Sequence, residues 1–127
     1  MEEEKVKIFI ADTEENEELK NYINKSKRFE IVGFAQKGSE ILQEVKACKP
    51  DFIIMEVMLP EMDGFMVLEN LKKEFGTSLP KIIFVSHLSH SGFISKAMKE
   101  GVSYFMVKPI SPQNLEERMM DILTSYK

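Results

Sequence analysis

Residues 52–64 read FIIMEVMLPEMDG and are the most informative segment for the fold. Residues 52–57 are apolar except for Glu56. An almost unbroken apolar run of this length is typical of a central parallel strand that is covered on both faces. A carboxylate at the end of such a strand is costly to bury without a partner, and Lys108 is the expected partner of Glu56.

Four other short apolar runs flank this strand along the chain, and amphipathic stretches separate them. The runs are residues 6–10, 31–34, 82–85 and 104–107. The first amphipathic stretch places Leu19, Tyr22 and Ile23 three and four positions apart, on one face of a helix. The chain therefore contains five strand-then-helix units, (βα)5. The expected fold class is α/β, with a five-stranded parallel sheet, doubly wound and flavodoxin-like, in a three-layer α/β/α sandwich.

Polar residues after the apolar runs are candidate helix caps. Asp12 or Thr13 is expected to cap the first helix, and Ser39 the second. Ser111 and Pro112 are expected to open the last helix, because proline is favoured at the first helical position.

Length and composition fit one domain that spans residues 1–127. The hydrophobic fraction of 43% argues against disorder, and no apolar run approaches the ~18 residues that a membrane span needs. The net charge of −4 disfavours direct binding to nucleic acid, which requires a basic surface. The acidic N-terminus is not a secretory signal, and the single cysteine, Cys48, cannot form an internal disulfide. The expected location is therefore the cytoplasm, without membrane association.

Polar side chains stand where most of the predicted strands end. Asp12 and Thr13 follow the first run, Glu56 lies near the end of the third, Ser86 follows the fourth and Lys108 follows the fifth. In an open α/β sheet, ligands bind outside the carboxyl ends of the strands, where the strand order reverses. These side chains are therefore expected to form one pocket, suited to a metal ion and a phosphoryl group. Taken alone, Asp12 is equally well explained as a helix cap.

Four stretches carry a family pattern: residues 8–12, 55–64, 84–86 and 104–109, which read IFIAD, MEVMLPEMDG, FVS and YFMVKP. In this order and spacing they resemble the receiver domain of bacterial two-component signalling, the CheY-like response-regulator family. The resemblance extends from about residue 5 to residue 123. The sequences of residues 31–33 and 103–105 resemble the corresponding stretches in the receiver of the sporulation master regulator.

The resemblance implies roles for the acidic end of the pocket. Asp12 and Thr13 take the positions of the acidic pair that binds magnesium, Glu56 takes the position of the phosphorylated aspartate, and the Met58 carbonyl would be a metal ligand. Thr13 lacks the carboxylate that Mg²⁺ favours, and the extra methylene of Glu56 displaces the nucleophile from in-line geometry. A magnesium site formed by Asp12, Glu56 and Met58 is therefore expected to be weak or absent.

The resemblance also implies a switch. Ser86 would bond a phosphoryl oxygen, Phe105 would be the aromatic switch residue, and Lys108 would pair with the acid. The peptide bond between Lys108 and Pro109 is often cis in this family.

The leading hypothesis is an atypical receiver, not an enzyme, that acts by protein interaction and does not depend on phosphorylation. Glu56 would mimic the charged aspartate and bias the switch. The output face would be formed by the fourth helix, the fifth strand and the last helix, and would bind a second copy, a C-terminal effector domain of a longer natural protein, or another protein. A histidine kinase or phosphotransfer protein would be the ancestral partner.

Two other hypotheses stay open. One is a phospho-switch with a non-standard acceptor, for which Asp51 lies at the wrong end of the third strand and Asp63 reads as a turn residue or helix cap. The other is a flavodoxin-like protein that binds a small molecule, although the segment after the first strand has no glycine to cradle a phosphate. His87 and His90 are expected to be solvent-facing loop residues.

Overall fold

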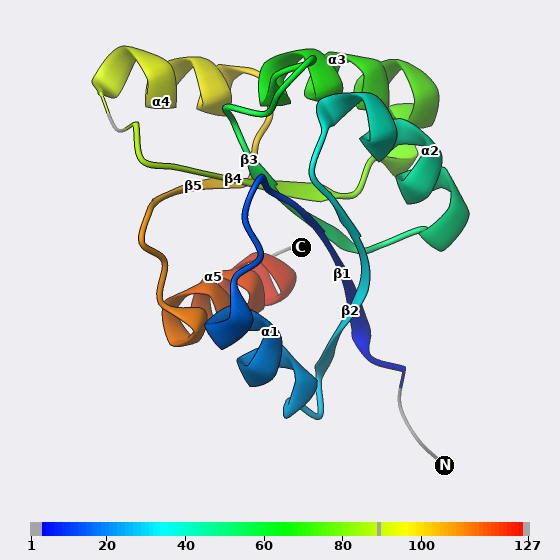
Figure 1. Cartoon of the computed structure of the whole chain (residues 1–127), viewed down its shortest axis with the longest axis vertical. Helices are drawn as coiled ribbons and strands as arrows, with labels where there is room; N and C mark the ends of the chain where they lie inside the picture. Colours follow the sequence, from blue (N-terminus) through cyan, green and yellow to red (C-terminus); the bar gives the residue numbers. More distant parts are fainter. Residues whose placement is uncertain (1–3, 89, 126–127) are drawn as a thin grey trace.

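The computed structural model describes residues 4–88 and 90–125. At its centre is a five-stranded parallel sheet with the strand order β2-β1-β3-β4-β5 (Figure 1). The strands are β1 (Val6–Ala11), β2 (Phe29–Ala35), β3 (Phe52–Glu56), β4 (Lys81–Ser86) and β5 (Tyr104–Val107). Because β2 and β3 lie on opposite sides of β1, the strand order reverses between β1 and β3.

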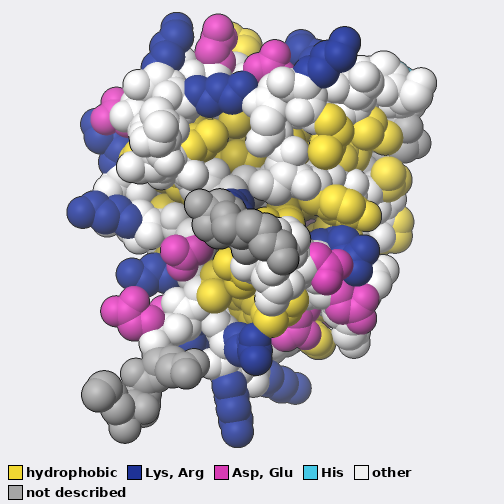
Figure 2. All heavy atoms as spheres, turned by 180° about the vertical axis from the view of Figure 1, so that it is seen from behind, with side chains coloured by type: hydrophobic (Ala, Val, Ile, Leu, Met, Phe, Trp, Pro, Cys, Tyr) yellow, Lys and Arg dark blue, Asp and Glu magenta, His cyan; other side chains and the backbone are white. Residues whose placement is uncertain are grey.

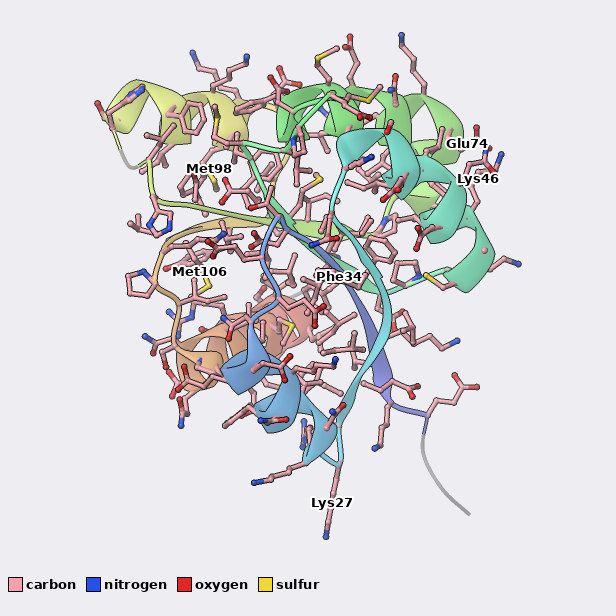
Figure 3. All side chains as sticks on the ribbon, viewed as in Figure 1. Lys27, Phe34, Lys46, Glu74, Met98 and Met106 are labelled. Carbon is pink, nitrogen blue, oxygen red and sulfur yellow. The ribbon has the colours of Figure 1, made fainter. Side chains whose placement is uncertain are left out.

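Helices cover both faces of the sheet, so the predicted three-layer α/β/α fold is confirmed (Figure 1). One face carries α1 (Glu17–Asn24) and α5 (Pro112–Ser125). The other carries α2 (Gly38–Cys48), α3 (Gly64–Phe75) with the short 3-10 helix η1 (Gly76–Ser78), and α4 (Ser91–Lys99). An ion pair between Lys46 and Glu74, with 3.5 Å between Nζ and Oε2, joins α2 to α3 (Figure 3).

The hydrophobic core has two halves that are separated by the sheet. Ile53 and Met55 of β3 point into the half under α2, α3 and α4, whereas Phe52 and Ile54 point toward α1 and α5. Every residue of β3 is buried, Glu56 included. The apolar run thus forms the doubly covered central strand that its sequence predicts.

The pairing of β1 with β2 contains an irregularity that the sequence did not indicate. Ile8 pairs with Ile31, but the next residue, Phe9, pairs with Gly33, so Val32 is an extra residue in β2. A Cβ atom at Gly33 would lie 2.6 Å from Cδ2 of Phe9. Glycine is therefore required here because the Phe9 ring occupies the space of a side chain.

The predicted start of α1 is wrong. The cap is Asn16, whose side chain accepts a hydrogen bond from the Leu19 N–H at 3.0 Å, so neither Asp12 nor Thr13 caps this helix. Asp12 is instead engaged by Lys108. Asp12 therefore forms a tertiary ion pair and does not fill the capping role that its residue type favours.

The predicted cap of α2 is also wrong, whereas the start of α5 is confirmed. Lys37 is the cap residue of α2 and makes no side-chain cap hydrogen bond, so Ser39 lies inside the first turn. α5 begins at Pro112, and the Ser111 hydroxyl accepts from the Asn114 N–H at 3.3 Å. Within the described part of the chain, no helix has the length and apolar character needed to cross a membrane.

Candidate functional site

Polar side chains gather at the edge of the sheet where the carboxyl ends of four strands meet. Asp12 follows β1, Glu56 is the last residue of β3, Ser86 is the last residue of β4, and Lys108 follows β5. Asp12 and Glu56 lie on either side of the strand-order reversal, where the topology rule expects a site.

The ammonium group of Lys108 bridges the two carboxylates. Its Nζ atom is 2.7 Å from Oδ2 of Asp12 and 2.8 Å from Oε1 of Glu56. The exposed fractions of the Lys108, Asp12 and Glu56 side chains are 12%, 14% and 7%, so both ion pairs are largely shielded from water and salt. The Lys108 N–H donates to the Ser86 carbonyl at 2.8 Å, and the peptide bond between Lys108 and Pro109 is cis, as expected.

The second oxygen of Glu56 is bonded by the loop that follows β3. The Met58 N–H donates a hydrogen bond of 2.8 Å to Oε2 of Glu56. Ser86 lies beside this group and is 1% exposed, and its hydroxyl accepts from the Leu88 N–H at 3.2 Å. Both carboxylate oxygens of Glu56 therefore have partners within the protein.

Opposed effects act on the pKa of Glu56. Burial raises the pKa, because it removes water from the charged carboxylate. Hydrogen bonds from Lys108 and the Met58 N–H, the charge of Lys108 and a weaker hydrogen bond from Ser86 together outweigh burial. The pKa of Glu56 thus lies below its ordinary value, and the carboxyl group is ionised at neutral pH.

Lys108 shows the mirror-image balance. Burial lowers the pKa of its ammonium group, but the hydrogen bonds to Asp12 and Glu56 and their negative charges outweigh it. The pKa of Lys108 is therefore raised, and the side chain is a permanent cation. At neutral pH the group of Asp12, Glu56 and Lys108 holds two negative charges and one positive charge.

Thr13, the second position of the expected acidic pair, lies outside this group. Its side chain is exposed, and its carbonyl accepts a 3.1 Å hydrogen bond from the Gln36 side chain. Among residues 4–88 and 90–125, no three His, Cys, Asp or Glu side chains are placed so that they could hold a metal ion. Because Mg²⁺ needs several oxygen ligands and Lys108 already bonds both carboxylates, these residues fit a magnesium ion poorly.

Phe105, the expected aromatic switch residue, belongs to a group of four phenylalanines that we call the aromatic cluster: Phe65 of α3, Phe84 of β4, Phe93 of α4 and Phe105 of β5. The Phe105 ring lies 6.4 Å from that of Phe84 and 6.1 Å from that of Phe93, both edge to face. Phe65 contacts Phe84 at 5.1 Å and Phe93 at 5.5 Å. The half-buried Phe105 thus packs between β4 and α4, and in the sheet register it pairs with Phe84, two residues before Ser86.

Three contacts near the site were missed by sequence reasoning. The Met58 N–H bond to Glu56 is a main-chain contact, which leaves no mark in residue composition. The Ser39 hydroxyl donates to Oε1 of Glu61 at 2.7 Å, a tertiary contact between residues far apart in the chain. His90 is exposed, as expected, but it also caps α4, because its Nδ1 accepts from the Phe93 N–H at 3.2 Å.

Several known proteins are similar to this chain in sequence or in fold. The family model described as "Response regulator receiver domain" matches residues 8–120. The signal receiver domain of the response regulator NarL from Mycobacterium tuberculosis superposes with a TM-score of 0.85 at 22% identity, over 98% of this chain and 100% of that one. The response regulator domain of CheB from Thermotoga maritima superposes at 0.79 and 25% identity, over 95% and 98% of the two chains.

A third similar structure was solved with ligands. It is the CheX-CheY-BeF3-Mg complex from Borrelia burgdorferi, which superposes with a TM-score of 0.79 at 24% identity, over 93% of this chain and 89% of that one. The fold is thus shared with these solved structures.

Proposed function

The chain belongs to the response regulator receiver domain family, and from this premise we propose that it is an atypical receiver whose signalling state is set by Glu56 without a phosphoryl group. Glu56 occupies the phosphoacceptor position of the pattern MEVMLPEMDG. In this proposal the domain is a protein-interaction module and not an enzyme.

One observation carries the proposal: both oxygens of Glu56 are already bonded by the groups that surround the acceptor position. Oε1 pairs with Lys108 at 2.8 Å, and Oε2 accepts from the Met58 N–H at 2.8 Å. The glutamate is one methylene longer than aspartate, so its charge lies farther out from β3, toward the place of an added phosphoryl group. An ionised carboxylate that satisfies these donors supports a built-in mimic of the modified aspartate.

The same contacts disfavour phosphoryl transfer to Glu56. The acceptor oxygens are bonded, the acidic pair is incomplete at Thr13, and a longer nucleophile is displaced from an in-line geometry. Displacements of ~1 Å can reduce such rates about a hundredfold. A histidine kinase or phosphotransfer protein is therefore proposed as an ancestral partner.

The proposed output face is formed by α4, β5 and α5. It exposes Met98 of α4 together with Tyr104 and Val107 of β5. Seen from behind, hydrophobic side chains reach the surface on the side of the molecule where α4 and β5 lie (Figures 1 and 2), and Met98 is labelled on α4 in Figure 3. A second copy of the chain, an attached effector domain or another protein would bind there.

Mass spectrometry tests the proposal directly. The chain is incubated with acetyl phosphate or phosphoramidate and Mg²⁺, alongside Glu56→Asp and the double variant Glu56→Asp/Thr13→Asp. We expect no phosphoryl adduct on the wild type. Adduct formation should appear in Glu56→Asp, or only in the double variant if the missing metal ligand is the larger defect.

A clear result would overturn the proposal. If the wild type gains a phosphoryl group that is lost in Glu56→Ala, Glu56 is itself the acceptor. If the adduct persists in Glu56→Ala, a non-standard acceptor is in use.

No described contact favours such an acceptor. The Asp63 side chain accepts from the Met66 N–H at 3.0 Å as the cap of α3, and Asp51 accepts from the Lys7 N–H at 2.8 Å at the opposite end of β3. A flavodoxin-like small-molecule site likewise gains no support, because the segment between β1 and α1 contains no glycine.

A further inference from the structure

Glu61 has a backbone conformation that favours glycine. Its φ angle is 71°, and the Met62 N–H donates to the Pro60 carbonyl at 2.8 Å, so a hydrogen bond closes a three-residue turn around Glu61. A turn of this kind with positive φ is rare and strained for a residue with a side chain. Glycine would remove the strain, so a glutamate here needs a reason that lies in its side chain.

The Glu61 side chain contacts the start of α2. Its Oε1 accepts from the Ser39 hydroxyl at 2.7 Å, and its Oε2 lies 3.8 Å from Nζ of Lys37. Lys37 is the cap residue of α2 and supplies no side-chain cap of its own. The Glu61 carboxylate therefore brings negative charge to a helix N-terminus that lacks a local acceptor, which is a favourable position for an anion.

The backbone around Glu61 is pressed against the same turn of α2. The Gly38 N–H donates to the Pro60 carbonyl at 3.4 Å, and a Cβ atom at Gly38 would lie 1.9 Å from the Met62 carbonyl oxygen. No side chain fits between the two segments. The loop between β3 and α3 is thus fixed to α2 at its far end, by Glu61 and by the close contact at Gly38.

The near end of this loop carries the donor to the site. The Leu59 N–H donates to the Val57 carbonyl at 3.1 Å, which forms a second three-residue turn, around Met58. The N–H of Met58 is the group that bonds Oε2 of Glu56. Only Leu59 and Pro60 separate Met58 from Glu61, so the contacts of Glu61 limit where the Met58 N–H points.

We propose that Glu61 is a positioning residue of the site: its contact with Ser39 and Lys37 holds the loop after β3 so that the Met58 N–H bonds Glu56. The role rests on the proposed function, because this bond affects signalling only if Glu56 sets the state of the domain. The geometric claim itself can be tested without any phosphodonor or partner.

The test compares Glu61→Gly, Glu61→Gln and Ser39→Ala in the whole chain by NMR. Glu61→Gly removes the backbone strain and the tether together, so the urea midpoint should stay near that of the wild type. The exchange rate of the Met58 amide should nevertheless rise roughly two- to tenfold, because the exposed hydrogen bond between Ser39 and Glu61 no longer holds the loop. Ser39→Ala should act in the same direction with a smaller effect, and Glu61→Gln, which keeps an acceptor for Ser39, should stay close to the wild type.

A second readout separates positioning from general stability. The midpoint of the Glu56 carboxyl titration, followed by its ¹³C shift, should rise in Glu61→Gly, because a weaker bond from Met58 stabilises the carboxylate less. Lys49→Gly is the matched control: in the described part of the chain, Lys49 is the other non-glycine residue with positive φ, at 50°. It ends α2, far in sequence from the loop, and its substitution should move neither readout.

Two outcomes would overturn the inference. One is that the Met58 amide exchange rate and the midpoint of the Glu56 titration in Glu61→Gly equal those of the wild type. The other is a change in Glu61→Gly that Ser39→Ala does not share, which would trace the effect to the backbone instead of the side chain. Phosphorylation of wild-type Glu56 would contradict the proposed function, but both NMR readouts are recorded without a phosphodonor and do not depend on that result.

Discussion

The ion group of Asp12, Glu56 and Lys108 and the aromatic cluster are held together by different interactions. In the ion group, the Lys108 ammonium lies 2.7 Å from a carboxylate oxygen of Asp12 and 2.8 Å from one of Glu56, so opposite charges hold the group together. In the aromatic cluster, ring centroids lie 5.1 to 6.4 Å apart, and no ring depends on the charge of another.

This difference determines how each region should respond to change. Loss of a ring removes buried area and leaves a cavity, so the cost depends on its burial and not on pH. Loss of one charged partner leaves the remaining charges unpaired, so the cost depends on pH and is recovered by removing the other charges.

Phe84→Ala should have the largest effect. Phe84 is fully buried in β4 and contacts both Phe65 and Phe105. Truncation of a buried phenylalanine costs about 3–5 kcal/mol of unfolding free energy. Urea denaturation at pH 7 and pH 5 should give the same loss; a loss that depends strongly on pH would contradict the assignment of this region to packing.

Lys108→Met should cost about 2–4 kcal/mol at pH 7, because it leaves Asp12 and Glu56 unpaired in a site that is mostly shielded from water. The loss should shrink as pH falls and the two carboxylates are protonated. The double variant Lys108→Met/Glu56→Met should regain part of the stability. Equal losses in the single and double variants would show that the ion pairs are not coupled.

The pH dependence of Glu56 should be smaller, because it reflects only the difference between its folded and unfolded pKa. The folded pKa is lowered, so the stability that Glu56 contributes is fully present above its unfolded pKa of ~4.3 and is lost as pH falls through the folded value. Unfolding free energy measured between pH 7 and pH 3 should therefore fall more steeply in the wild type than in Glu56→Gln. A steeper fall in Glu56→Gln would contradict the sign of this shift.

His90→Ala should have the smallest effect, about 1 kcal/mol, through loss of the α4 cap. Because α4 carries Phe93 onto the aromatic cluster, the Phe93 amide should exchange faster in this variant. His87→Ala is the control: His87 is exposed, and its substitution should leave unfolding free energy within ~0.5 kcal/mol of the wild type. Similar losses in both variants would argue against a capping role.

Much of the fold could be predicted from the sequence because its signals are local. The apolar run of β3 and the spacing of Leu19, Tyr22 and Ile23 each report which faces a segment buries. The extra residue Val32 in β2 could not be predicted, because it depends on room for the Phe9 ring in another strand.

The cap of α1 was predicted wrongly for a related reason. Asp12, Thr13 and Asn16 are all residue types that cap helices, and composition does not choose among them. Lys108, which lies far along the chain, binds Asp12 through a tertiary contact that local sequence does not reveal. Asn16 is left to cap α1.

The site divides in the same way. Asp12, Glu56, Ser86 and Lys108 could be placed at one edge of the sheet because strand ends in a parallel sheet meet there. The hydrogen bond from Met58 to Glu56 could not be predicted, since its donor is a main-chain N–H that residue types do not reveal.

The position of Lys108 has a consequence for the edge of the sheet that β5 forms. It follows the edge strand β5, yet its ammonium reaches across β4 to groups on β3 and β1, so one side chain ties the ends of three strands. Exchange of Glu56 for aspartate withdraws one anchor by about one carbon–carbon bond, ~1.5 Å. Either the ammonium follows, and the start of α5 shifts with it, or that anchor is released. The length of the acidic side chain at residue 56 should therefore affect the position of the segment that joins the edge strand β5 to α5.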